Sequence, residues 1–132
     1  MKQMSKKEFI REVFSAIFGA QPFNEQFISS HVSRDYVQHG DGQTLHYDDF
    51  VNHIRMLKER TKEIRISFKS LAEDNDLVFS NHTVVATMPD GKMSTLHVIA
   101  EFHVRNGQMC YCDELSHLEN GDSAASDLGT IH

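Results

Sequence analysis

The spacing of apolar residues changes near residue 64, and this change constrains the fold more than any other feature of the chain. Before it, apolar residues recur every three or four positions, as on one face of a helix. After it, apolar and polar residues alternate, as in "IRISFKS". The sequence therefore predicts helices first and an antiparallel sheet afterwards, which is an α+β arrangement.

Three helices are predicted in the first half. The first covers residues 5–19, with Ser5 as N-cap and Glu8 as its capping-box partner. A short helix follows Pro22, and a third covers roughly residues 48–61, capped by Asp48. Between the second and third helices, "RDYVQH" is predicted to be a short strand that ends at Gly-Asp-Gly, residues 40–42.

Four long strands are predicted in the second half. The alternating runs are separated by Asp-Asn-Asp at 74–76, Pro-Asp-Gly at 89–91 and Asn-Gly at 106–107, which are turn signals typical of hairpins. Runs of about 10–12 residues exceed the usual strand length, so we expect a strongly bent, mostly antiparallel sheet. Helices 5–19 and 48–61 are expected to cover one face and to form a cone with a central pocket.

Composition limits the classes of partner. With 132 residues, the chain is expected to form one domain, residues 1–132, with a polar tail over 120–132. The net charge of −6 argues against nucleic acid, and no apolar run is long enough for a membrane span, so we expect a cytoplasmic protein. Cys110 and Cys112 are expected to share one face of a strand as buried free thiols.

The order of these elements resembles the SnoaL-like family of the nuclear transport factor 2-like superfamily. The resemblance covers roughly residues 6–119 and rests also on "YVQHGDG", on "YDDFVNHIRML" and on "VRNGQMCYCDEL". It implies the ketosteroid isomerase and polyketide cyclase type of fold, with a pocket for a small molecule. Helix 5–19 contains no tyrosine, so the phenolic donor of the isomerases has no counterpart here.

His39 and Asp113 are the predicted catalytic residues. The resemblance puts His39 where the isomerases hold a general-base carboxylate and many SnoaL-like proteins hold a histidine. The alternation of faces along the strand also predicts that Val37 carries His39 inward and turns Tyr36 away or to the rim. Asp113 would then lie on an inward face of the last strand and act with His39 in acid–base chemistry. The alternative is that His39 caps the strand end and Asp113 accepts a backbone hydrogen bond.

The remaining candidates are predicted to contact the ligand. Tyr111 shares the expected inward face of Asp113, and Tyr36 offers a second phenol. His53 lies one turn from apolar residues of its helix, and His82 falls on a strand face that we expect to point inward. Phe14 belongs to the apolar stripe of the first helix. Filling of the core is the competing interpretation for the aromatic and histidine side chains.

Two classes of function follow. The first is a cofactor-independent isomerase, dehydratase or cyclase that acts on a small apolar carbonyl or hydroxyl compound by His/Asp chemistry. The second is a non-catalytic domain that binds a ligand or a protein with the same cone. The histidines have no metal-ligand spacing, so no metal is expected. Homodimerisation is predicted through the convex sheet face, which would present His97, Ile99, Glu101 and His103.

Overall fold

The computed structural model describes residues 4–120, and its three helices agree closely with the three helices predicted from the sequence. They are α1 (Lys6–Phe18), α2 (Glu25–His31) and α3 (Tyr47–Arg60). Ser5 caps α1 as predicted, because its Oγ accepts a hydrogen bond from the Glu8 amide at 3.1 Å. Helix α3 differs from the prediction, since it begins one residue before Asp48, with His46 as N-cap. The Asp49 carboxylate accepts from the His46 amide at 3.0 Å and holds this start.

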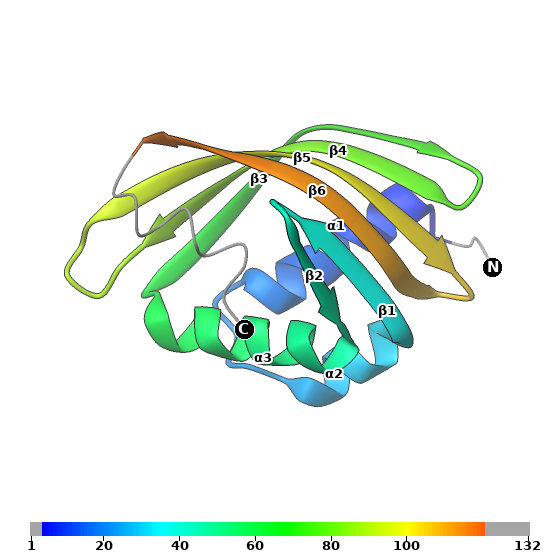
Figure 1. Cartoon of the computed structure of the whole chain (residues 1–132), viewed down its shortest axis with the longest axis horizontal. Coiled ribbons are helices and arrows are strands. Elements are labelled where there is room, and N and C mark those ends of the chain that lie inside the picture. Colours follow the sequence, from blue (N-terminus) through cyan, green and yellow to red (C-terminus); the bar gives the residue numbers. More distant parts are fainter. Residues whose placement is uncertain (1–3, 121–132) are drawn as a thin grey trace.

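The strands form one curved sheet (Figure 1). They are β1 (Val32–Gly40), β2 (Gln43–His46), β3 (Glu63–Asp74), β4 (Leu77–Thr87), β5 (Met93–Arg105) and β6 (Gln108–Asn120). Their order is β2-β1-β6-β5-β4-β3. All neighbours are antiparallel except β1 and β6, which are parallel. The sequence predicted the four long strands, but it did not predict β2 or the parallel pairing of β1.

The predicted turns adopt the backbone that their residues favour. Asp41 and Gly42 have φ values of 51° and 85°, and Asn106 and Gly107 have φ values of 54° and 72°. Left-handed backbone at both central residues matches the twist of a two-residue hairpin, and Asp, Asn and Gly tolerate it best. The turn at residues 41–42 is therefore the end of a hairpin that returns as β2.

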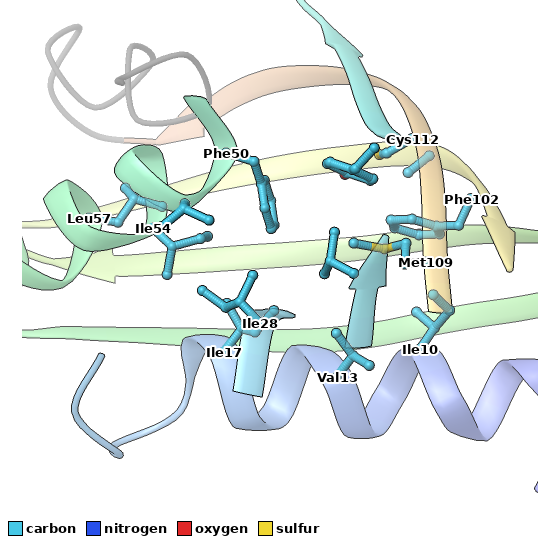
Figure 2. Close-up of a cluster of buried hydrophobic side chains, with 14 of the residues drawn as sticks. Ile10, Val13, Ile17, Ile28, Phe50, Ile54, Leu57, Phe102, Met109 and Cys112 are labelled. Carbon is cyan, nitrogen blue, oxygen red and sulfur yellow. The ribbon is translucent and has the colours of Figure 1, made fainter. Parts of the chain in front are cut away.

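Helices α1 and α3 cover the concave face of the sheet, as predicted. Figure 2 shows Ile10, Val13 and Ile17 of α1 pointing towards the strands, with Ile54 of α3 and Phe102 of β5 in the same layer. All five side chains are buried. Of the predicted tail at 120–132, only Asn120 lies within the described residues, as the last residue of β6.

A bulge at the start of β6 changes which of its side chains face the core. Val104 pairs with Met109 and His103 pairs with Tyr111, so Cys110 is an extra residue without a partner on β5. A bulge of one residue reverses the alternation beyond it. Consequently Cys112 is buried while Cys110 is only half-buried, and the prediction that both cysteines share a buried face was wrong. Both are free thiols, as predicted.

Candidate ligand cavity

A cavity of about 90 Å³ lies between the concave face of the sheet and the helices. Its lining is mainly apolar and comes from α1, α3 and every strand except β2. The polar side chains on its wall are Tyr36, Gln38, His53, His82, Glu114 and Ser116. An apolar cavity with a few convergent polar groups is the usual form of a site for a small molecule.

Tyr36, Gln38 and Glu114 form a hydrogen-bonded series along one wall. The buried Tyr36 hydroxyl donates to Gln38 Oε1 at 2.7 Å. Because that oxygen is engaged, the amide nitrogen of Gln38 faces Glu114 Oε1, at 3.5 Å. The parallel pairing of β1 and β6 brings these residues together, since Gln38 pairs with Cys112 and Gly40 with Glu114.

Glu114 is a carboxyl group in a largely apolar environment. Burial, together with smaller contributions from the nearby carboxylates of Asp41 and Asp113, raises its pKa from the ordinary 4.5 to about 7. A carboxyl group with a pKa near neutrality can accept and return a proton at physiological pH. This combination of burial and neighbouring charge is typical of functional carboxyl groups.

The turn between β1 and β2 holds the strand beside Glu114. Asp41 Oδ1 accepts from the Ser116 amide at 3.0 Å, and Oδ2 accepts from the Ser116 hydroxyl at 2.5 Å. Gly40 leaves the space that Glu114 occupies, because a Cβ on Gly40 would lie 3.1 Å from Glu114 Cγ. The Gly-Asp-Gly turn thus packs against Glu114 and Ser116, which line the cavity.

The opposite wall of the cavity carries His82 and His53. His82 is 2% exposed, and burial lowers its pKa from 6.5 to about 4, with a further contribution from His97. Its Nδ1 lies 2.8 Å from Ser80 Oγ. His53 is also buried, next to Phe50. Phe14 of α1 lines the cavity with its ring against His82 and Phe102.

The predicted orientation of His39 was wrong. Tyr36 and Gln38, and not Val37 and His39, point into the cavity from β1. Tyr36 packs on Phe50 of α3 with ring centroids 4.9 Å apart, and its large ring buries more apolar surface there than a valine would. His39 therefore lies on the outer face, with Nδ1 3.0 Å from Thr44 Oγ1.

The predicted orientations of Asp113 and Tyr111 were wrong for a different reason. The bulge at Cys110 places both on the outer face, where Asp113 is exposed. The Tyr111 ring lies between His103 and His39, with centroids 4.5 Å and 5.6 Å away. His39 and Asp113 are neighbours in the register, as expected, but on the wrong side of the sheet. The acid–base roles predicted for His39 and Asp113 stay predictions, and neither side chain lines the cavity.

Sequence reasoning missed Gln38 and Glu114. Gln38 was missed because the packing of Tyr36 on Phe50 of α3, which fixes the inward face of β1, cannot be read from the strand alone. Glu114 was missed because of the bulge at Cys110, which no turn signal in the sequence predicts. Within residues 4–120 no group of three or more His, Cys, Asp or Glu side chains is arranged to hold a metal ion. No helix of that part is long and apolar enough to cross a membrane.

Comparison with known proteins agrees with this architecture. The SnoaL-like domain family matches residues 10–112. The chain belongs to the SnoaL-like domain family. An uncharacterised protein of Schizosaccharomyces pombe is 26% identical over 125 residues, which cover 95% of this chain and 95% of that protein.

Solved structures share the fold of this SnoaL-like protein at low sequence identity. The proposed polyketide cyclase IdmH from Streptomyces antibioticus superposes with a TM-score of 0.73 at 12% identity, covering 86% of this chain and 92% of that one. The proposed hydroxylase AclR from Streptomyces galilaeus gives a TM-score of 0.72 at 19% identity, covering 98% and 89%. The predicted resemblance to the SnoaL-like group is thereby confirmed.

Proposed function

We propose that this SnoaL-like protein binds a small, largely apolar molecule in the cavity and moves a proton on it with Glu114. The observation that carries the proposal is a carboxyl group with a pKa of about 7 on the wall of an apolar cavity. The class of reaction is a cofactor-independent isomerisation, dehydration or cyclisation of a carbonyl or hydroxyl compound. Glu114 takes the role that the sequence had suggested for His39 and Asp113.

The surroundings of Glu114 support this role. The Gln38 amide nitrogen donates towards Glu114 Oε1 across 3.5 Å, and burial favours the protonated form of Glu114 and raises its pKa to about 7. A pKa of about 7 keeps both the protonated and the ionised form of Glu114 accessible near neutral pH. Phe14, Tyr36, His53 and His82 are proposed to contact the ligand, as expected from the sequence, since all four line the cavity.

The size of the cavity limits the ligand. Its volume of about 90 Å³ is smaller than the roughly 150 Å³ that an engineered cavity uses to hold benzene. A ligand of about six heavy atoms therefore fits with small side-chain adjustments or with one end at the opening. We choose cyclopentanone as the test compound, because it combines this size with acidic α-protons.

The first prediction is that the protein exchanges the α-protons of cyclopentanone in D₂O, measured by proton NMR. The rate should rise with pH and level off above about pH 7, as Glu114 becomes a base. Glu114→Gln keeps the shape and removes the base, so the rate should fall by about 100-fold or more. Asp113→Asn, the matched change on the outer face, should stay within about twofold of the parent chain.

Either of two results would contradict the proposal. Glu114→Gln could retain the exchange rate, or Asp113→Asn could abolish it, in which case the role predicted for Asp113 from the sequence would be favoured. Binding of cyclopentanone without exchange would favour the second class of function, a non-catalytic ligand-binding domain. The mainly apolar lining of the cavity fits that alternative as well.

We also propose that the convex sheet face pairs with a second copy of the chain. Phe79, Ile99 and Leu115 on this face are 44%, 50% and 71% exposed, and Ile99 and Leu115 are direct neighbours on β5 and β6. Exposed apolar side chains on adjacent strands are typical of an interaction surface. The face also includes His97, Glu101 and His103, as the sequence predicted.

The second prediction concerns this pairing. The protein should sediment as a dimer at micromolar concentration, and Leu115→Gln should shift it towards monomer because a polar group replaces buried apolar surface. Met4→Gln is the control, since Met4 is 48% exposed but lies before α1, outside the sheet. Sedimentation of the parent chain as a monomer would refute the pairing.

A further inference from the structure

His82 is held in one orientation on the cavity wall. Its ring lies against the rings of Phe14 and Phe68, with centroids 5.8 Å and 5.3 Å away. The side chain is only 2% exposed and belongs to the lining of the cavity. Burial among these groups lowers the pKa of the imidazole to about 4, so the ring is neutral at neutral pH. A neutral imidazole has one N–H donor, and its position depends on the tautomer.

Ser80 selects that tautomer. Its hydroxyl is buried at 4% exposure and lies 2.8 Å from His82 Nδ1. Within residues 4–120 no other hydrogen-bond partner of this hydroxyl is found. A buried hydroxyl proton without an acceptor is unfavourable, so Ser80 donates to Nδ1. The ring proton must then be on Nε2, at the tip of the imidazole.

The Nε2 donor has no partner within the described part of the chain. The sheet register relates it to Glu114. His82 pairs with Val98, which pairs with Ser116, while Glu114 is two residues before Ser116 on β6. His82 and Glu114 are therefore two strands apart, about 10 Å across the sheet, and both line the same cavity. A small molecule between them can contact a donor on one side and a carboxyl group on the other.

We propose that His82 donates a hydrogen bond from Nε2 to a carbonyl oxygen of the ligand, which makes the substrates small ketones or related carbonyl compounds. This inference rests on the proposed function of Glu114. In the step, the Glu114 carboxylate takes a proton from the α-carbon. The C–H electron pair forms the carbon–carbon double bond, and the carbonyl π pair moves to oxygen, where the His82 N–H stabilises the charge. Return of the proton from Glu114 to carbon completes the cycle.

The test measures the tautomer and the binding selectivity separately. Nitrogen-15 NMR of the full chain should show the His82 proton on Nε2. Cyclopentanone is then compared with methylenecyclopentane, which has nearly the same shape but no oxygen. His82→Phe should weaken binding of cyclopentanone about five- to tenfold and change binding of methylenecyclopentane less than about twofold. His82→Gln, which retains an N–H donor, should recover most of the affinity for cyclopentanone. This variant shows whether the weaker binding in His82→Phe comes from the lost donor or only from a structural change.

The outcomes distinguish this inference from the proposed function. A proton on Nδ1, or equal weakening of both compounds by His82→Phe, overturns the carbonyl contact, while exchange that still depends on Glu114 leaves the proposed function intact. If Glu114→Gln loses the exchange activity but keeps its cyclopentanone affinity within about twofold of the parent chain, both the role of Glu114 and the His82 contact are supported. If the parent chain binds neither compound, both proposals are overturned.

Discussion

The two faces of the sheet carry similar residue types in very different environments. On the concave face, Phe102 is 1% exposed and His82 lies among aromatic rings with a serine as its partner. On the convex face, Phe79 is 44% exposed and His103 contacts the Glu101 carboxylate at 2.7 Å. Burial among apolar groups disfavours the charged form of a histidine and holds His82 neutral at neutral pH. The environment, and not the residue type, therefore separates the groups suited to chemistry from those suited to association.

The largest expected difference between the faces is in packing. Phe102→Ala should lower the free energy of unfolding by about 3–5 kcal/mol, because it leaves a cavity in the core. Phe79→Ala should cost less than about 1 kcal/mol in the monomer, because its ring remains partly in water. Urea denaturation of the two variants measures this difference. Equal costs would mean that the convex face is buried in the folded state.

A smaller and pH-dependent difference is expected for Glu114 and Asp113. The folded-state pKa of Glu114 is about 7 against an ordinary 4.5. The folded state therefore holds a proton that the unfolded state releases between these values, and stability falls as pH rises through this window. Glu114→Gln removes this penalty. It should stabilise the protein by about 1–3 kcal/mol near pH 8, and the gain should vanish near pH 4.5.

The control for this prediction is Asp113→Asn, on the exposed face of the same strand. Its effect on the free energy of unfolding should stay below about 0.5 kcal/mol at both pH values. Urea denaturation at the two pH values gives both numbers. A gain for Glu114→Gln that does not change with pH would show that Glu114 is not buried as a titrating group.

The smallest expected effect tests whether the β1–β2 turn influences the cavity. Asp41→Asn removes a negative charge near Glu114 while its side-chain oxygen can still accept from the Ser116 amide. The pKa of Glu114 should fall by a fraction of a unit, since the nearby charge helps to raise it. Carbon-13 NMR of the Glu114 carboxyl gives the midpoint. The decrease in the pKa of Glu114 should exceed the decrease caused by Asp113→Asn. The reverse order would show that the β1–β2 turn does not influence Glu114 more than the outer face does.

For Phe14 and His82, burial could be inferred from the residue's own element, while their contact with a ligand stays a prediction. Phe14 belongs to an apolar stripe at helical spacing, and His82 belongs to a regular strand face, and both line the cavity. His39 and Asp113 were also placed by assuming that strand faces alternate regularly from a known inward residue. That assumption fails on both of their strands. On β1 the face is chosen by Tyr36 packing on Phe50, and on β6 it is reversed at Cys110.

The sequence by itself determined the three helices, the four long strands and the positions of the turns. These depend on local preferences: helical or alternating spacing, N-caps such as Ser5, and left-handed backbone at Asp41-Gly42 and Asn106-Gly107. Only the tertiary structure decided which faces of β1 and β6 point inward, and therefore that Glu114 and not Asp113 reaches the cavity. The physical reason is that strand faces alternate with a period of two, so one bulge or one packing contact with a distant helix exchanges every residue between the core and the surface.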